Sequence, residues 1–172
     1  MKILAALLLA TNCAIATRLP QVKHYDTSKV ENLFFAPSVI SDLFSAYEAQ
    51  TATNKEQALC LYGSIRGDTL VASSTRPSNY IRNTESNVVF ADSLQGCPEA
   101  IGFLGGVHTH PVLPDGTVVN FFTPDDKHTF WRDSRALVLL LLYAQKGDFL
   151  FAVFELRDGR WSNTLFRRPD TQ

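Results

Sequence analysis

Two histidines stand one residue apart in the segment His108-Thr109-His110-Pro111, directly after an apolar stretch. On an extended chain, residues i and i+2 project from the same face, so both imidazoles can reach one metal ion. Imidazole nitrogen is a common protein ligand of zinc. The chain has 4 histidines in all, so two within one tripeptide indicate a candidate metal site.

Carboxylates that could complete such a site lie on both sides of the histidine pair. Thr123 is followed three places later by Asp126, and Glu56 precedes an apolar run. Two imidazoles and Asp126 would supply three protein ligands and leave the fourth zinc position to water, which is typical of catalytic zinc. A nearby glutamate that is not a ligand can take the proton from that water and pass it to a leaving amine.

Together these residues resemble the JAMM metalloproteases, also called MPN+ or JAB domain proteins, whose pattern is Glu, then His-x-His-Pro, then Ser-x-x-Asp. The stretch from Glu56 to Gly63 is similar to the family's Glu-x-x-Gly-Leu-Leu-x-Gly, and the resemblance covers roughly 33–161. It implies that Glu56 is the general base and that Thr123 takes the place of the serine that stabilises the oxyanion. The ligands that it implies for Zn²⁺ are His108, His110 and Asp126.

The chain departs from the family pattern at three places. Leu59 stands where the family has its first glycine, and Thr123 stands where it has serine. The twelve residues between the histidine pair and Thr123 make a longer loop than is usual in the family. Asp115 within this loop and Asp125 beside Asp126 are alternative third ligands, but the motif spacing favours Asp126.

The resemblance also implies the fold: α/β, a single three-layer αβα domain of the JAB/MPN, cytidine-deaminase-like, type with a mixed central sheet. Other zinc enzymes fit less well. Zinc deaminases need His-x-Glu and Pro-Cys-x-x-Cys, whereas Cys97-Pro98 has the reverse order. The His-Glu-x-x-His motif of zincins is absent. The His-x-His pair of amidohydrolases belongs to a TIM barrel, which needs roughly 250 residues, so this chain is too short for that fold. Neither Cys60 nor Cys97 lies in a thiol-protease signature.

The elements that must position these residues are one helix and several short strands. Residues 33–36 favour a strand, and Pro37-Ser38 opens a helix with apolar side chains at helical spacing, which stops within 51–54. Further strands are expected at 58–62, 69–72, 87–91 and 101–107, a turn at 65–68, and loops at 75–85 and 111–117. The glycines of 101–107 indicate a strand that closely approaches other backbone.

The last third of the chain has the strongest strand signal. Two apolar runs, 136–143 and 149–156, flank Gln145-Lys146-Gly147-Asp148, which predicts a hairpin. Asp158-Gly159 marks a further turn before Trp161. We therefore expect one mixed α/β domain over 33–166 and a polar tail over 167–172.

Composition sets limits on partners. The 172 residues carry 16 basic and 17 acidic side chains, a net charge of −1, without a long run of Lys or Arg. This balance argues against nucleic-acid binding, which needs a basic surface. At 45% hydrophobic residues, the chain has the composition of one globular domain with a sizeable core.

Residues 1–16 have the features of a signal peptide. Lys2 precedes a wholly apolar run, and Ala14-Ile15-Ala16 supplies the small-x-small pattern that signal peptidase accepts. The stretch is shorter than the roughly 20 residues that span a bilayer, so no stable membrane anchor is expected. Residues 17–32 would form an N-terminal arm. A secreted or periplasmic location is expected, with a cytoplasmic one as the alternative.

Cleavage after Ala16 would leave two cysteines, Cys60 and Cys97. In an oxidising compartment they could form one bridge, but two buried free thiols are an equally good interpretation. Composition does not decide between these states.

The sequence therefore predicts a zinc-dependent peptidase or isopeptidase that acts on a protein or peptide, including ubiquitin-like proteins. The alternatives are a catalytically silent MPN-like binding or assembly module and another zinc amide hydrolase. The complete set of ligands and base favours an active enzyme. Ubiquitin-like substrates are cytosolic, whereas an exported enzyme would meet other proteins or peptides. The sequence does not indicate an oligomeric state.

We predict that residues 1–16 are absent from the mature protein, because they carry a charged start, an apolar run and a cleavage pattern. Mass spectrometry of protein from its native source should give a mature chain that begins at Thr17. Intact Met1 on protein inside the cell would overturn export.

Overall fold

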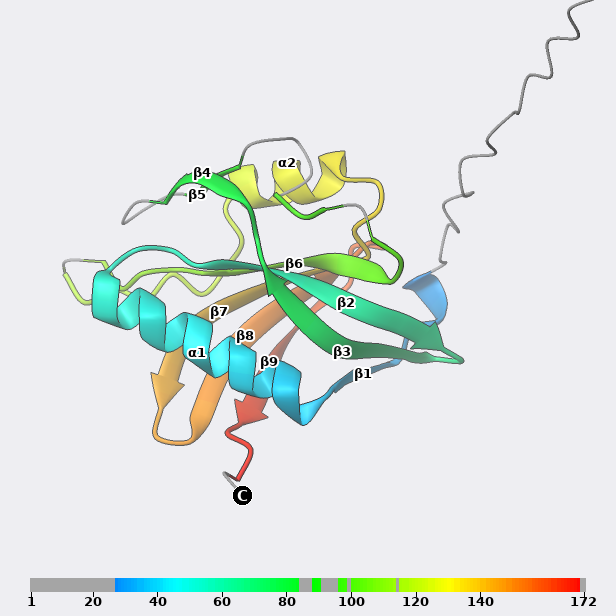
Figure 1. The fold of residues 1–172 in the computed structure, drawn as a ribbon, viewed down its shortest axis with the longest axis horizontal. Helices are drawn as coiled ribbons and strands as arrows, with labels where there is room; N and C mark the ends of the chain where they lie inside the picture. Colours follow the sequence, from blue (N-terminus) through cyan, green and yellow to red (C-terminus); the bar gives the residue numbers. More distant parts are fainter. Residues whose placement is uncertain (1–26, 84–87, 91–95, 99, 114, 171–172) are drawn as a thin grey trace, which may run out of the picture.

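The computed structural model describes residues 27–83, 88–90, 96–98, 100–113 and 115–170 (Figure 1). The predicted signal peptide, His24 and most of the N-terminal arm lie outside these residues. In chain order the elements are η1 (Thr27–Lys29), β1 (Asn32–Phe35), α1 (Pro37–Thr53), β2 (Ala58–Arg66), β3 (Thr69–Pro77), β4 (Tyr80–Asn83), β5 (Val88–Phe90), β6 (Phe103–Thr109), α2 (Pro124–Arg132), β7 (Val138–Lys146), β8 (Phe149–Leu156) and β9 (Trp161–Arg167).

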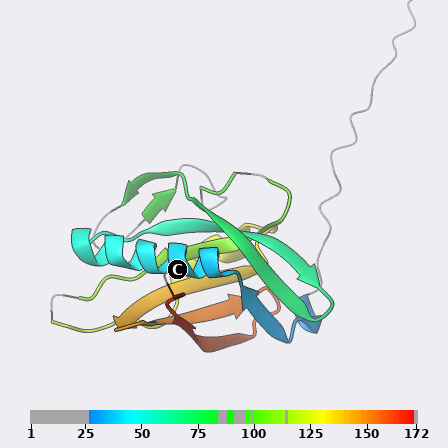
Figure 2. The same cartoon turned by 60° about the horizontal axis from the view of Figure 1, so that its bottom comes forward.

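Seven strands form one sheet in the order β1-β3-β2-β6-β7-β8-β9. The β1–β3 and β6–β7 pairs are parallel, and the other neighbours are antiparallel. The α/β class with a mixed sheet is therefore confirmed. The sheet is a curled half-barrel rather than a flat middle layer (Figure 2), and this curl is a feature that the sequence did not indicate.

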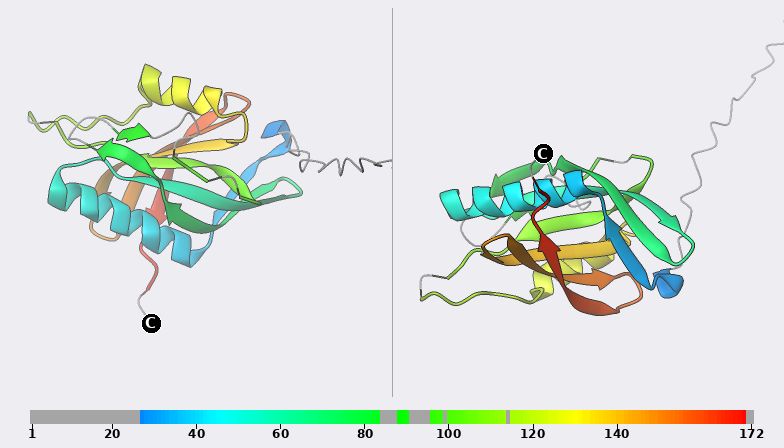
Figure 3. Two further views of the ribbon diagram at one scale, coloured as in Figure 1. Left: turned by 45° about the horizontal axis from the view of Figure 1, so that its top comes forward. Right: turned by 90° about the horizontal axis from the view of Figure 1, so that it is seen from below.

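The two helices pack on opposite faces of this sheet (Figure 3). On β7, Leu140 and Leu142 join the core cluster that contains Phe44 of α1. Leu139 and Leu141 join the second cluster, which contains Phe130 of α2. Successive residues of a strand point to opposite faces, so one run of leucines supplies both cores.

Helix α1 has the start, the end and the buried face that the sequence predicts. Pro37 occupies its first turn, where the missing N–H costs nothing, and Asn54 ends it in a left-handed conformation with φ 52°. The side chains buried along α1 are Val39, Leu43, Phe44, Ala46, Tyr47 and Gln50.

Strand β6 is the fourth of the seven strands, and each of its residues is buried. Its glycines allow the close approach that the sequence predicts. A Cβ on Gly105 would lie 1.7 Å from the carbonyl oxygen of Val138 on β7, so no larger residue fits without moving a strand. The parallel β6–β7 pairing, which continues to His108 opposite Leu141, depends on this glycine.

The expected loop over 75–85 is wrong in part, because β3 continues to Pro77 and β4 occupies 80–83. The long hairpin partner β2 supports this extension of β3, whose Ser73, Ser74 and Arg76 are exposed. A strand whose side chains face water has a polar sequence, which is why composition suggested a loop there. The strand expected at 87–91 appears as β5, and the C-terminal hairpin appears as β7 and β8.

Cys60 and Cys97, which are 37 positions apart in the sequence, form a disulfide, which settles the choice that composition left open. Cys60 lies on β2 opposite Gly106 of β6, and both cysteines are buried in the core cluster beneath α2. The bridge therefore fixes the 96–98 segment to the central strands.

Among the described residues, no helix is long and apolar enough to cross a membrane.

We predict that replacing both cysteines with alanine lowers the free energy of unfolding by about 3 to 4 kcal/mol, because a cross-link over this separation restricts the unfolded chain. Urea unfolding with and without reductant measures the effect. The double alanine variant serves as the control, since reductant should not change its midpoint. Equal midpoints for the parent in both conditions would show that the bridge contributes no stability.

Candidate metal centre

The two histidines lie at the end of the buried central strand. His108 is the penultimate residue of β6, and His110 follows the strand directly. Thr109 between them points the other way, is fully buried and accepts a hydrogen bond from the backbone N–H of Gln57 at 2.9 Å. Strand alternation thus places both imidazoles on one face, where His108 is 8% exposed and His110 5%.

Asp126 reaches the histidines from the first turn of α2. Thr123 caps this helix, and its hydroxyl accepts a hydrogen bond from the backbone N–H of Asp126 at 3.2 Å. In return, Asp126 Oδ2 accepts from the backbone N–H of Thr123 at 2.7 Å and from its hydroxyl at 2.8 Å. This capping box is worth about 1 kcal/mol to a helix, and here it also fixes the direction of the carboxylate.

Contacts at both ends hold α2 against the sheet. Near its start, the Lys127 ammonium lies 3.1 Å from the buried carboxylate of Glu155 on β8. At its end, the guanidinium of Arg157 donates to the carbonyl oxygens of Phe130 at 2.9 Å and Trp131 at 3.2 Å. A cation that binds the last carbonyls of a helix also interacts favourably with its dipole. The position of Asp126 relative to β6 is therefore set by the β8 region.

The three side chains converge on one point. His108 Nε2 lies 3.3 Å from Asp126 Oδ1, His110 Nε2 lies 3.3 Å from Asp126 Oδ2, and the two Nε2 atoms lie 3.2 Å apart. With metal–ligand bonds of 2.0–2.2 Å in a tetrahedron, two zinc ligands lie about 3.3 Å apart. The donor set and its spacing therefore fit zinc, and these three residues are close enough to hold a metal ion.

The other ring nitrogen of His110 decides which tautomer is present. His110 Nδ1 lies 3.2 Å from the carbonyl oxygen of Val119, and a carbonyl oxygen can only accept. Nδ1 therefore carries the proton, and in neutral imidazole Nε2 presents its lone pair to the point of convergence. Metal-bound histidines commonly have such a carbonyl behind them, because it orients the ring and raises its basicity.

The carboxyl group of Asp126 is strongly acidic. Burial by itself would raise its pKa, but the charges and hydrogen bonds of His108 and His110 outweigh burial and hold the pKa well below its usual range. In this arrangement Asp126 therefore strongly favours the ionised form. An anion beside two lone-pair donors is the state that a divalent cation requires of its ligands.

Glu56 lies next to the histidine strand. Ala58 pairs with His108, and the backbone N–H of Thr109 donates to the carbonyl of Gln57 at 3.0 Å, so the ladder continues past the end of β2. Glu56 directly precedes this paired segment, so continuing the register by one residue would set it opposite His110. Its side chain is 8% exposed, which is unusual for a glutamate.

The hydroxyl of Thr123 has a partner, Asp126, that was not predicted from the sequence. Its single hydrogen is donated to Asp126 Oδ2, so in this arrangement Thr123 orients a candidate ligand. A role in stabilising an oxyanion, which the family resemblance implies, stays a prediction. The signal for the capping box was present, because Thr123-Pro124-Asp125-Asp126 has a capping hydroxyl, proline at the first helical position and a carboxylate three residues on. No sequence signal could identify the Val119 carbonyl.

The alternative ligands lie elsewhere. Asp115 is exposed in the loop, where its carboxylate accepts from the backbone N–H of Thr117 at 2.9 Å. Asp125 and His128 are exposed on α2. The structure thus brings together His108, His110 and Asp126 and attaches Thr123 to Asp126, whereas Glu56 lies in the segment that leads into β2. No family model and no curated protein sequence matches the chain.

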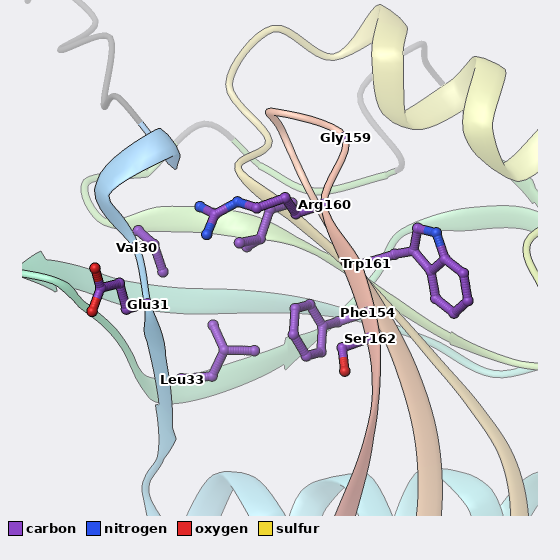
Figure 4. Close-up of a pocket in the computed structure, with 9 residues that line it drawn as sticks. Val30, Glu31, Leu33, Phe154, Gly159, Arg160, Trp161 and Ser162 are labelled. Atoms are coloured by element: carbon purple, nitrogen blue, oxygen red, sulfur yellow. The ribbon is translucent and has the colours of Figure 1, made fainter.

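A cavity of about 470 Å³ lies apart from this cluster, between β1 and the β8–β9 hairpin. Figure 4 shows Leu33 and Phe154 facing each other across it, whereas the Trp161 indole points away. Arg160 at its edge already donates to Asp158 Oδ2 at 2.7 Å and to the carbonyl of Thr27 at 2.6 Å. The cavity is mainly apolar, and the chemistry described here does not use it.

We predict that Asp126→Asn weakens zinc binding by more than about 10²-fold, which exceeds the 10–100-fold cost of losing a second-shell partner. Asp125→Asn is the matched control, since it changes the same side chain one position away on the exposed surface. Competitive titration with a zinc chelator measures both affinities. Equal loss in the two variants would remove Asp126 from the metal site.

Proposed function

We propose that the chain is a zinc-dependent peptidase or isopeptidase of the JAMM type. The observation that carries this proposal is the convergence of two imidazole nitrogens and a carboxylate at 3.2–3.3 Å, with His110 Nδ1 protonated against the Val119 carbonyl. Three protein ligands leave a tetrahedral ion one position for water or substrate. The JAB/MPN assignment, with three layers, belongs to this proposal and rests on the motif and on the helices that cover opposite faces of the sheet.

The residues of the chain would divide the work of amide hydrolysis. When bound, zinc supplies Lewis acidity, which makes a water at the site acidic enough to lose a proton near neutral pH. Glu56 accepts that proton as the water oxygen attacks the carbonyl carbon. The Glu56 carboxyl then delivers the proton to the amine nitrogen as the C–N bond breaks. Thr123 holds Asp126 in place during both steps.

The substrate that we propose is a protein or peptide, with ubiquitin-like proteins as one class. Export is also part of the proposal. The disulfide between Cys60 and Cys97 supports it, because structural disulfides persist in oxidising compartments and are rare in the cytosol. An exported enzyme would encounter extracellular or periplasmic polypeptides rather than cytosolic ubiquitin conjugates.

We predict that Glu56→Gln lowers kcat by about 10² to 10⁴-fold, because glutamine keeps the shape but cannot accept a proton. Zinc content and the unfolding midpoint should stay at the level of the parent. The assay is hydrolysis of an internally quenched peptide library by zinc-loaded protein. The control is Glu48→Gln, which makes the same change on the exposed side of α1.

Two results would contradict this mechanism. Cleavage by the Glu56→Gln variant at the parental rate would remove Glu56 as the base. Stoichiometric zinc without hydrolysis of any peptide, isopeptide or small amide would favour the silent binding module.

A further inference from the structure

The segment between the two halves of the metal centre forms a projecting hairpin, which we define by its described residues, 111–113 and 115–122. Val112 and Val118 pair as an antiparallel bridge, and the backbone N–H of Leu113 donates to the carbonyl of Thr117 at 2.9 Å. In Figure 1 this hairpin is the yellow-green segment that extends to the left, and it also stands away from the sheet in Figures 2 and 3.

Several apolar side chains of the hairpin are exposed. Its exposed apolar side chains are Val112 at 42%, Leu113 at 40%, Val118 at 40% and Phe121 at 61%. These are four of the ten large apolar side chains that are exposed among the described residues. Single exposed apolar residues are normal, but a group gathered on one element typically marks an interaction site.

The base of the hairpin is part of the metal centre. The Val119 carbonyl accepts from His110 Nδ1, and the buried Phe122 ring lies 6.2 Å from the His108 ring. The hairpin begins directly after one candidate ligand and ends directly before Thr123. A polypeptide bound at the metal centre would therefore lie near the base of the hairpin.

We propose that the hairpin binds an extended polypeptide segment with apolar side chains next to the bond that is cleaved. This inference rests on the proposed peptidase function and narrows its substrate from proteins and peptides in general to unfolded or extended chains. The exposed residues of the hairpin, chiefly Val118 and Phe121, supply contacts that determine specificity. They do not contribute to the chemical step, since none is a ligand, base or cap.

Charge distinguishes this partner from a membrane surface. Residues 111–122 contain no Lys or Arg, and their one charged side chain is Asp115. Surfaces that attach to anionic lipids need cations to accompany their apolar residues. The hairpin therefore fits an apolar peptide better than a lipid headgroup layer.

The test measures binding without turnover, using the full chain with Glu56→Gln and zinc. The probe is a fluorescein-labelled ten-residue peptide rich in Leu, Val and Phe, compared with the same peptide carrying Ser at those positions. Adding Phe121→Ser should raise the Kd of the apolar probe about tenfold, the loss expected when one anchoring aromatic contact is removed. Phe34→Ser is the matched control, because Phe34 is 53% exposed on β1, at the edge of the sheet.

A second readout separates recognition from catalysis. In the active parent background, Val118→Ser should lower kcat/KM for the apolar peptide about tenfold and leave hydrolysis of a small chromogenic amide unchanged. Zinc content should equal that of the parent.

Several outcomes would overturn the proposal. Unchanged Kd in the Phe121→Ser variant, or equal loss in the Phe34→Ser control, would show that the hairpin is not the recognition element. Binding to phosphatidylcholine vesicles that depends on Phe121, without peptide binding, would assign the hairpin to membranes. Failure of the peptidase proposal is seen separately, as a parent protein that binds the probe through the hairpin but does not hydrolyse it.

Discussion

The geometry of the candidate metal centre depends on the capping box between Thr123 and Asp126. The carboxylate of Asp126 accepts a hydrogen bond at the start of α2 and also faces the two histidines. The helix cap therefore sets the direction of a candidate metal ligand. Two hydrogen bonds from Thr123 go to Oδ2, and Oδ1 lies 3.3 Å from His108 Nε2. A polar group used twice in this way is ordered before any ion binds, which lowers the entropic cost of assembling the centre.

The rest of the fold holds the carboxylate of Asp126 and the two imidazoles together, although their burial removes them from water. An anion and two imidazoles that are mostly buried lose hydration, so they must be held by partners. Strand β6, packed on both faces and closely against β7 at Gly105, fixes the histidines. Arg157 and the Lys127–Glu155 pair fix α2. The disulfide holds a further segment on the same face of the sheet.

The sequence predicted those features that depend on local pattern. Helix α1 followed from apolar spacing and a first-turn proline, and the β7–β8 hairpin from two apolar runs around Gly147. The convergence of the histidine pair on Asp126 was predicted from the family motif that these residues resemble. Long-range features were less visible: the curl of the sheet was not predicted, and the polar end of β3, residues 75–77, was expected to be a loop. Helix α2 was not predicted from the sequence, although Thr123 and Asp126 have the pattern of a capping box.

The central claim is that His108, His110 and Asp126 bind one zinc ion and leave a position open. X-ray absorption at the zinc edge of stoichiometrically loaded protein tests it most directly. The account predicts a four-coordinate shell with two imidazole nitrogens and two oxygens at about 2.0 to 2.1 Å, one oxygen from Asp126 and one from water. A shell containing sulfur at about 2.3 Å, or one without imidazole, would contradict it.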